Sequence, residues 1–266
     1  MSWYSLGAGL LHAAAAEAVK TAMTIPLLMV MWLTLANDLG GDIGIQLPRV
    51  EGSFYPKKLA ASKMLPYYTA RFSTVGINYT FYRAPSESIL EGWSRATPER
   101  SRLTLKAPRR ITHDARLRAC GDRVRQCFDT AATLGPKLGA LLFQLPTNLK
   151  KDIALLDRFL KDFPPKARAA FEFRHVSWFD RLRARNIALC IADSEKLSTP
   201  VEVTADYAYF RLRDEGYTAE DIARWASTIR DRASACSDVF VYFKHEDAGK
   251  GPECGRMIID LVGGAG

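Results

Sequence analysis

The chain has 266 residues, a formal net charge of +8 and 48% hydrophobic residues. Its length is close to that of one eight-unit barrel and excludes two large domains. The apolar content is enough for a sizeable core and excludes global disorder. The excess of positive charge favours an anionic partner, either a small molecule or a nucleic acid, although basic residues can also form an ordinary solvated surface.

The first 48 residues differ from the rest, because they contain one lysine and no arginine. Residues 22–36 form an uncharged run, which is short for a membrane-spanning helix and lacks the flanks of a signal peptide. We predict that residues 1–41 are a divergent or mis-annotated segment outside the fold. Residues 42–266 would then form the domain, with residues 42–47 as an irregular first strand, and no contact with a membrane is expected.

Seven short apolar runs further along the chain each end in a polar residue, which is typical of parallel strands whose carboxyl ends open into a cleft. They are residues 74–78, 103–106, 140–144, 168–175, 187–193, 207–211 and 239–245. Helical patterns separate most of them, at residues 61–72, 86–95, 114–134, 152–163, 177–185 and 218–235, with a last helix ending near residue 261. This alternation predicts an α/β fold, a TIM-barrel-like parallel (β/α) barrel with its active site at the carboxyl ends of the strands.

One connection departs from regular alternation, and two loops carry residues of interest. Only about a dozen residues separate the sixth and seventh of the expected barrel strands, so we predict a weak or missing helix 6. Residues 79–83 and 108–113 are expected to be loops, the first rich in aromatic residues and the second carrying two arginines. Thr218, with Asp221 three residues later, is expected to cap the helix that follows.

Five cysteines are scattered along the chain without a Cys-x-x-Cys pair: Cys120, Cys127, Cys190, Cys236 and Cys254. This pattern indicates neither a disulfide framework nor a zinc ribbon. A reducing compartment fits it best, so we expect a cytoplasmic protein.

Six ordered segments carry a family resemblance. They are Gly-Ser-Phe-Tyr-Pro (52–56), Ile-Asn-Tyr-Thr-Phe-Tyr-Arg (77–83), Lys-Ala-Pro-Arg-Arg-Ile-Thr-His (106–113), Phe-Gln-Leu-Pro (143–146), Phe-Glu-Phe-Arg-His-Val-Ser-Trp-Phe (171–179) and Tyr-Phe-Lys-His-Glu-Asp (242–247). With them the chain, from residue 52 to about 261, resembles the DUF72 or YecE-like family. The resemblance implies a TIM-barrel-like fold and, because the family has no established activity, it implies no particular reaction.

Two departures from the family pattern bear on the site. The resemblance implies a Gly-Thr-Ser-Gly-Trp-type motif on the first strand, where this chain has Ile-Gly-Ile-Gln-Leu-Pro-Arg-Val. It also implies Val-Glu-Ile-Asn on the second strand, where this chain has Val-Gly-Ile-Asn. Gly76 therefore replaces a carboxylate that would face the site, which would impair the protein if that carboxylate is catalytic in relatives.

Five ionisable residues at or near strand ends are the predicted catalytic groups: Lys106, His113, Glu172, His175 and Asp193. A barrel could gather them at one mouth, where they could transfer protons. Histidines with carboxylates could also bind a divalent metal, although their spacing is not diagnostic and we predict neither a metal site nor a cofactor. A structural role is the alternative for each, including an ion pair between Glu172 and Arg174.

The predicted substrate-binding residues combine positive charge, amide groups and aromatic faces. They are Asn78, Tyr82, Arg83, Gln144, Arg174, Trp178, Arg211, Lys244 and His245. Charge beside aromatic rings suits a nucleotide or a single nucleic-acid strand, although aromatic residues in barrel loops more often serve packing. Arg211, Arg213, Lys244 and His245, followed by a glycine-rich turn, also predict an anion site at the last two strands.

These residues lead to two hypotheses from different classes. One is a hydrolase that acts on a phosphorylated or nucleic-acid substrate, and the other is a non-catalytic protein that binds an anionic ligand. The chain has no P-loop, no dinucleotide-binding fingerprint and no Gly-x-Ser-x-Gly elbow. Because alternate barrel strands contribute to one interior layer, we also expect Glu172 and Lys106 to share a polar cleft.

Overall fold

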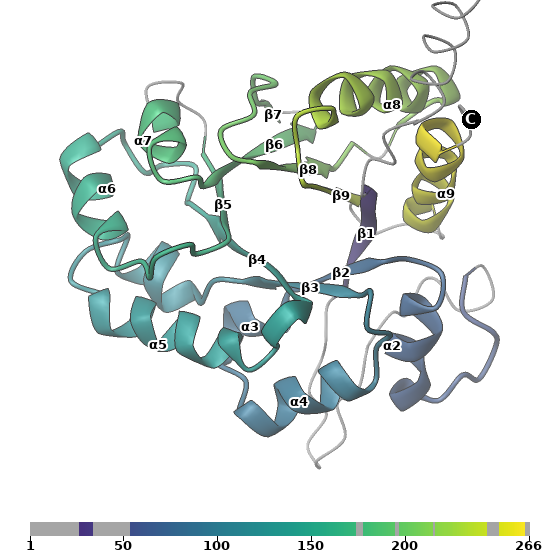
Figure 1. Cartoon of the computed structure of the whole chain (residues 1–266), viewed down its shortest axis with the longest axis horizontal. Coiled ribbons are helices and arrows are strands. Elements are labelled where there is room, and N and C mark those ends of the chain that lie inside the picture. The colour runs from purple at the N-terminus through teal and green to yellow at the C-terminus, as the bar shows by residue number, and fades with distance from the viewer. Residues whose placement is uncertain are drawn as a thin grey trace, which may run out of the picture.

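Parallel strands alternate with helices and enclose a barrel. Figure 1 shows the strands in the middle of the molecule and the helices around them. The computed structural model describes residues 27–33, 54–173, 178–194, 197–214, 216–243 and 250–263. The strands are β1 (Leu27–Leu33), β2 (Thr74–Ile77), β3 (Arg102–Lys106), β4 (Leu138–Gln144), β5 (Ala169–Glu172), β6 (Ala188–Ser194), β7 (Leu197–Ser198), β8 (Tyr207–Leu212) and β9 (Asp238–Phe243). The helices are α2 (Ala61–Thr69), α3 (Tyr79–Tyr82), α4 (Glu87–Arg95), α5 (Gly121–Ala132), α6 (Ile153–Leu160), α7 (Phe179–Arg183), α8 (Ala219–Ala233) and α9 (Lys250–Gly263), with a π-helix at Arg110–Asp114 and a 3-10 helix at Gly135–Lys137.

Within these residues, eight strands close the ring. Each of β1 to β6, β8 and β9 pairs in parallel with two neighbours, and the pairing of β5 with β6 completes the circle. Between β6 and β8 the only regular element that the structure describes is the two-residue β7, which lies antiparallel to the end of β6. The predicted TIM-barrel-like fold and its weak or missing helix 6 are confirmed.

The first strand lies earlier in the chain than predicted. β1 falls inside the uncharged run and pairs with β9 along Leu27–Met31 and with β2 at Trp32 and Leu33. The prediction that all of residues 1–41 lie outside the fold is therefore wrong for β1, and β1 occupies the place assigned to residues 42–47, which lie outside the described residues. An apolar run too short for a membrane suits a parallel strand buried on both faces. The rest of the division at residue 42 stays a prediction.

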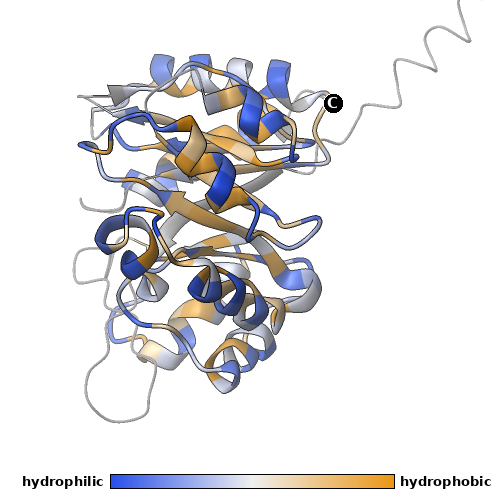
Figure 2. Cartoon of the chain, turned by 90° about the vertical axis from the view of Figure 1, so that its left-hand side faces the viewer, coloured by the Kyte–Doolittle hydropathy of each residue, from blue (hydrophilic) through white to orange (hydrophobic). Residues whose placement is uncertain are grey.

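Alternation along each strand divides its side chains between the surrounding helices and the barrel interior. On the outer face, Phe143 of β4 and Phe171 of β5 stack with ring centroids 5.1 Å apart, and both contact Phe159 and Phe163 in and after α6. Figure 2 shows the same division, with apolar strands in the middle and polar residues on the helices outside.

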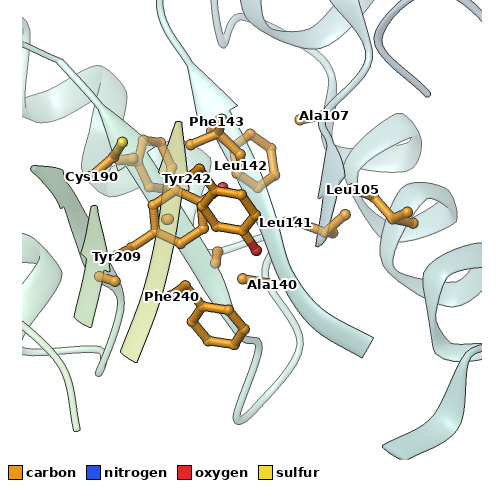
Figure 3. Packing of buried hydrophobic residues seen from close by; sticks show 14 of the residues in the cluster. Leu105, Ala107, Ala140, Leu141, Leu142, Phe143, Cys190, Tyr209, Phe240 and Tyr242 are labelled. Carbon is orange, nitrogen blue, oxygen red and sulfur yellow. The ribbon is translucent and has the colours of Figure 1, made fainter. Parts of the chain in front are cut away.

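Inside the barrel, aromatic rings enclose a small polar network. Tyr209 and Tyr242 stack with ring centroids 4.9 Å apart. Figure 3 shows both side chains among the buried residues. The Tyr242 hydroxyl donates to Thr104 Oγ1 at 2.6 Å and lies 3.2 Å from Thr74 Oγ1. Tyr209 precedes Arg211 by two residues, so this packed layer forms the floor of the carboxyl-end mouth.

Several helix boundaries follow the local chemistry. The capping box at α8 forms as expected, with Thr218 Oγ1 accepting from the Asp221 N–H. The helix predicted over residues 114–134 begins only at residue 121, because Arg116, Leu117 and Ala119 have positive φ angles that break a right-handed helix. The two expected loops are partly helical, since α3 occupies most of the first and the π-helix overlaps the second.

Deletion of residues 1–41 should open the ring, because β1 bridges β2 and β9. We expect the truncated chain to lose cooperative thermal unfolding, measured by circular dichroism. A second truncation, which removes residues 1–20 and keeps β1, is the matched control. Equal cooperativity in the full chain and in the chain without residues 1–41 would show that β1 is dispensable.

Candidate functional site

Glu172 lies at the carboxyl end of β5 and is 5% exposed. Arg211 of β8 donates to Glu172 Oε2 at 2.5 Å, and Arg213 lies 3.2 Å from Glu172 Oε1. Gln144, its register partner at the end of β4, donates to Oε1 at 3.0 Å. One buried carboxylate therefore ties together the carboxyl ends of three strands.

The two arginines decide the charge of this carboxylate. Burial alone raises the pKa of Glu172, but Arg211 and Arg213 outweigh burial and hold the pKa below its usual value. The adjacent Cys190 Sγ lies 3.9 Å from Glu172 Oε2, and burial together with this carboxylate raises the pKa of the thiol. A carboxylate with a low pKa and occupied oxygens is a poor proton acceptor, so the geometry favours a positioning role for Glu172.

Lys106 ends β3 and shares the interior face with Thr104. It is 9% exposed, and its Nζ lies 4.1 Å from the centroid of the Phe81 ring. Burial, followed by repulsion from Arg211, lowers the pKa of Lys106 to about 8, although Glu172 acts in the opposite direction. Glu172 and Lys106 interact electrostatically, but Glu172 and Lys106 line different cavities, so the expected polar cleft shared by the two stays a prediction.

His113 lies in the π-helix beside Lys106. Its ring packs edge-on against Phe81 with centroids 5.0 Å apart, and its Nδ1 lies 2.9 Å from Thr112 Oγ1. Burial, then the positive charges of Lys106 and Arg109, lower the pKa of His113. The imidazole is therefore neutral at pH 7 and can accept a proton.

A cavity of about 270 Å³ opens beside Glu172. Gln144, Trp178 and Arg213 line it, together with Lys151 and an apolar wall that includes Phe173. Trp178 Nε1 and Arg213 Nε are buried donors that have no hydrogen-bond partner within the described part of the chain. Buried donors without acceptors are costly, so a cavity lined by the residues that carry them suits a ligand with acceptor oxygens.

Asp193, predicted to be catalytic, lies outside this cluster. Its Oδ2 accepts a hydrogen bond of 2.9 Å from the Tyr217 hydroxyl, and it lines a separate cavity next to α8. Asp193 and Cys190 occupy opposite faces of β6, because side chains alternate along a strand. The structure therefore does not bring Asp193 together with Glu172 and Lys106.

The remaining predicted residues fall into two groups. Asn78, Tyr82 and Arg83 follow β2 at the mouth, where Tyr82 is 71% exposed and Arg83 is exposed. Arg174, His175, Lys244 and His245 lie outside the described residues, so their predicted roles, and the predicted anion site in so far as it depends on them, stay predictions.

Sequence analysis assigns Arg213 only to the predicted anion site, and it does not assign Phe81 or Cys190 to the site. Alternation along β8 could have identified Arg213, because it continues the interior face of Tyr209 and Arg211 by one more step. The contact of Phe81 with Lys106 joins the ends of two strands, and no local sequence signal indicates it. Cys190 is buried in the middle of β6, and its proximity to Glu172 depends on the pairing of β5 with β6.

The described residues contain neither a cluster of metal ligands nor a membrane-spanning helix. No group of three or more His, Cys, Asp or Glu side chains in this part of the chain could hold a metal ion. Among the helices that the structure describes, none is both long and apolar enough to cross a membrane.

Comparison with known proteins identifies the family. The model of the family "Protein of unknown function DUF72" matches residues 44–266. The chain belongs to the DUF72 family. It is 24% identical to the UPF0759 protein YunF of Bacillus subtilis, over 79% of this chain and 90% of that protein. It is 30% identical to the UPF0759 protein YecE of Escherichia coli K12, over 43% of each chain.

Solved structures of DUF72 proteins have the same fold. The structure of a Thermotoga maritima family member aligns with a TM-score of 0.73 and 23% identity, over 88% of this chain and 99% of that one. An Enterococcus faecalis family member aligns with a TM-score of 0.71 and 16% identity, over 89% and 95%. At these identities, the likeness establishes the architecture alone.

Replacing Glu172 by Gln should destabilise this DUF72 protein strongly, because two guanidinium groups would lose their buried counter-charge. We expect a loss of about 3–5 kcal/mol in the free energy of unfolding at pH 7, measured with urea. The difference should vanish as the pH falls below the low pKa of Glu172 in the folded protein, since the wild-type carboxyl is then protonated.

The matched control is Glu91→Gln, which removes an exposed carboxylate 3.4 Å from Arg95. An exposed pair of this kind contributes about 0.2–0.5 kcal/mol. Equal effects of the two substitutions would contradict a structural role for the buried pair.

Proposed function

We propose that the carboxyl-end mouth of this barrel binds the phosphate of a phosphorylated or nucleic-acid substrate, and that the protein is a hydrolase acting on it. The observation that carries the proposal is the imbalance of charge in the buried cluster. Among its described groups, the cations Lys106, Arg211 and Arg213 face the single carboxylate of Glu172. A buried excess of positive charge is unfavourable until an anion enters.

Three further features favour phosphate over a smaller anion. Guanidinium groups match phosphate oxygens geometrically. The cavity beside Glu172 has room for more than one ion and is lined by Trp178 and Arg213, whose Nε1 and Nε donors find no acceptor among the described residues. Exposed arginines at Arg83, Arg109 and Arg110 surround the mouth, and such charges attract a polyanion before it reaches the buried cluster.

His113 provides the chemistry for hydrolysis in this proposal. Its neutral imidazole would accept a proton from water as the water attacks phosphorus, while the cationic cluster would stabilise the charge on the phosphate oxygens. Exposed Tyr82 would stack on a base if the substrate is a nucleotide or a single strand.

A non-catalytic anion-binding protein is the second candidate, and one observation favours it. Glu172 is held in ion pairs and Gly76 supplies no carboxylate, so the described part of the mouth lacks a free acidic group. Binding requires only the cations, whereas hydrolysis also requires His113.

Phosphate should raise the thermal unfolding midpoint more than chloride does at equal ionic strength, because binding to the folded state stabilises it. Arg213→Gln should reduce the affinity for phosphate about tenfold, since it removes a charged donor while Arg211 still pairs with Glu172. Isothermal titration calorimetry would measure the change.

Arg95→Gln is the matched control, because Arg95 is an exposed arginine on α4 that contacts only Glu91 among the described side chains. Tyr82→Ala keeps every charge and should weaken a single-stranded oligonucleotide without affecting phosphate. If wild type does not distinguish phosphate from chloride, the proposed anion site is wrong.

His113→Asn should lower the rate of hydrolysis of an active phosphoester by about 10²–10⁴-fold, the range for loss of a general base. The wild-type rate should fall as the pH drops through the lowered pKa of His113, and the variant should lose this dependence. A panel of phosphomonoesters, phosphodiesters and oligonucleotides provides the substrates. Phosphate binding without hydrolysis of any of them would refute the enzyme and leave the binding protein.

A further inference from the structure

The Lys106 amine is a buried cation that has no counter-ion of its own among the residues the structure describes. Both oxygens of the nearby Glu172 carboxylate are engaged, Oε2 by Arg211 and Oε1 by Arg213 and Gln144. Among the described residues, no carboxylate lies within ion-pair distance of Lys106, whose ammonium group instead packs on the face of Phe81.

The groups around the amine favour its neutral form. Burial has the largest effect, repulsion from Arg211 and Arg213 adds to it, and Glu172 partly offsets them. His113 is a further neighbour of Lys106, and its own pKa is lowered by burial and by the charge of Lys106. With a pKa of about 8 instead of 10.5, roughly a tenth of the amine is neutral at pH 7, several hundred times the fraction of an ordinary lysine.

We propose that Lys106 is a nucleophile that forms an imine with the carbonyl carbon of a phosphorylated aldehyde or ketone bound at the barrel mouth. Desolvated lysines beside other cations are the kind that form Schiff bases. The inference rests on the proposed function for the phosphate subsite, and it adds the substrate class and a covalent role that anion binding does not require.

The step balances without an oxidant or reductant. The lone pair of neutral Nζ attacks the carbonyl carbon, the π electrons of the C=O bond move to oxygen, and a proton shift gives a neutral carbinolamine. Protonation of its hydroxyl then lets water leave as nitrogen donates its lone pair, which gives a protonated imine. His113, which packs on the same Phe81 ring as Lys106, would exchange these protons, directly or through water.

The cationic surroundings also explain why the ligand should be anionic. A protonated imine restores the positive charge that Arg211 and Arg213 disfavour. A phosphate on the same ligand would offset these charges and hold the carbonyl close to Nζ. A neutral aldehyde provides neither effect, so it should react more slowly.

Pyridoxal 5′-phosphate is a suitable probe, because it carries an aldehyde and a phosphate, and pyridoxal lacks the phosphate. The full-length protein would be incubated with each, reduced with borohydride and digested, and the modified lysines would be mapped by mass spectrometry. We expect Lys106 to be labelled at least fivefold faster than the exposed Lys63 and Lys166. The rate should rise with pH around a midpoint of about 8 and fall when inorganic phosphate competes.

Lys106→Arg keeps the charge, removes the nucleophile and should lose this adduct. Lys106→Met is a second variant in case arginine does not fit, and thermal unfolding shows which of them is folded.

Labelling of Lys106 no faster than of Lys63 would overturn the proposal, even if wild type binds phosphate and the proposed function stands. Equal labelling by pyridoxal and its phosphate would overturn the phosphorylated substrate class, and absence of phosphate binding in the same protein would show that the proposed function has failed as well.

Discussion

The ion pairs of Glu172 with Arg211 and Arg213 are the constraint on which the mouth of the barrel depends. Transferring three charges out of water is expensive, and their attraction offsets that cost only when the geometry is good. Here Glu172, on β5, meets arginines that β8 brings from the far side of β6, and Gln144 completes the contacts from β4. The position of one carboxylate therefore depends on the register of four strands, and the ring closure that aligns them also creates the site.

The packed parts of the barrel that stabilise the fold are distinct from the mouth, where the cationic side chains lie. Outside, the phenylalanine cluster around Phe143 and Phe171 attaches helices to strands, and inside, Tyr209 and Tyr242 fill the middle layer. Above that layer the chemistry changes within two residues, from Thr104 to Lys106 and from Tyr209 to Arg211. In the floor, the Tyr242 hydroxyl bonds to Thr104, whereas the described mouth keeps an excess of cations. This arrangement is unfavourable for an empty protein and useful for one that must attract and bind an anion.

Local patterns in the sequence predicted the seven later barrel strands, because each is an apolar run with a polar exit. The same rule overlooked β1, since the uncharged run that contains residues 27–33 continues past the strand to residue 36 and lies in a segment of unusual composition. The partner of Glu172 could not be predicted either. Arg174, two residues away, was the local alternative, and the actual partners lie 39 and 41 positions further along the chain and depend on ring closure.

Gly76 connects the family pattern to the state of Lys106. It shares the interior face of β2 with Thr74, and it pairs in register with Thr104, so Lys106 lies one interior step further on the neighbouring strand. The resemblance places a carboxylate where this chain has Gly76. Such a group would give Lys106 a counter-charge and favour the ammonium form, whereas glycine leaves the two arginines and burial to dominate. Loss of that carboxylate would therefore make the neighbouring Lys106 amine more nucleophilic, and the midpoint of the Lys106 labelling curve would measure how far the charge balance of the mouth has shifted.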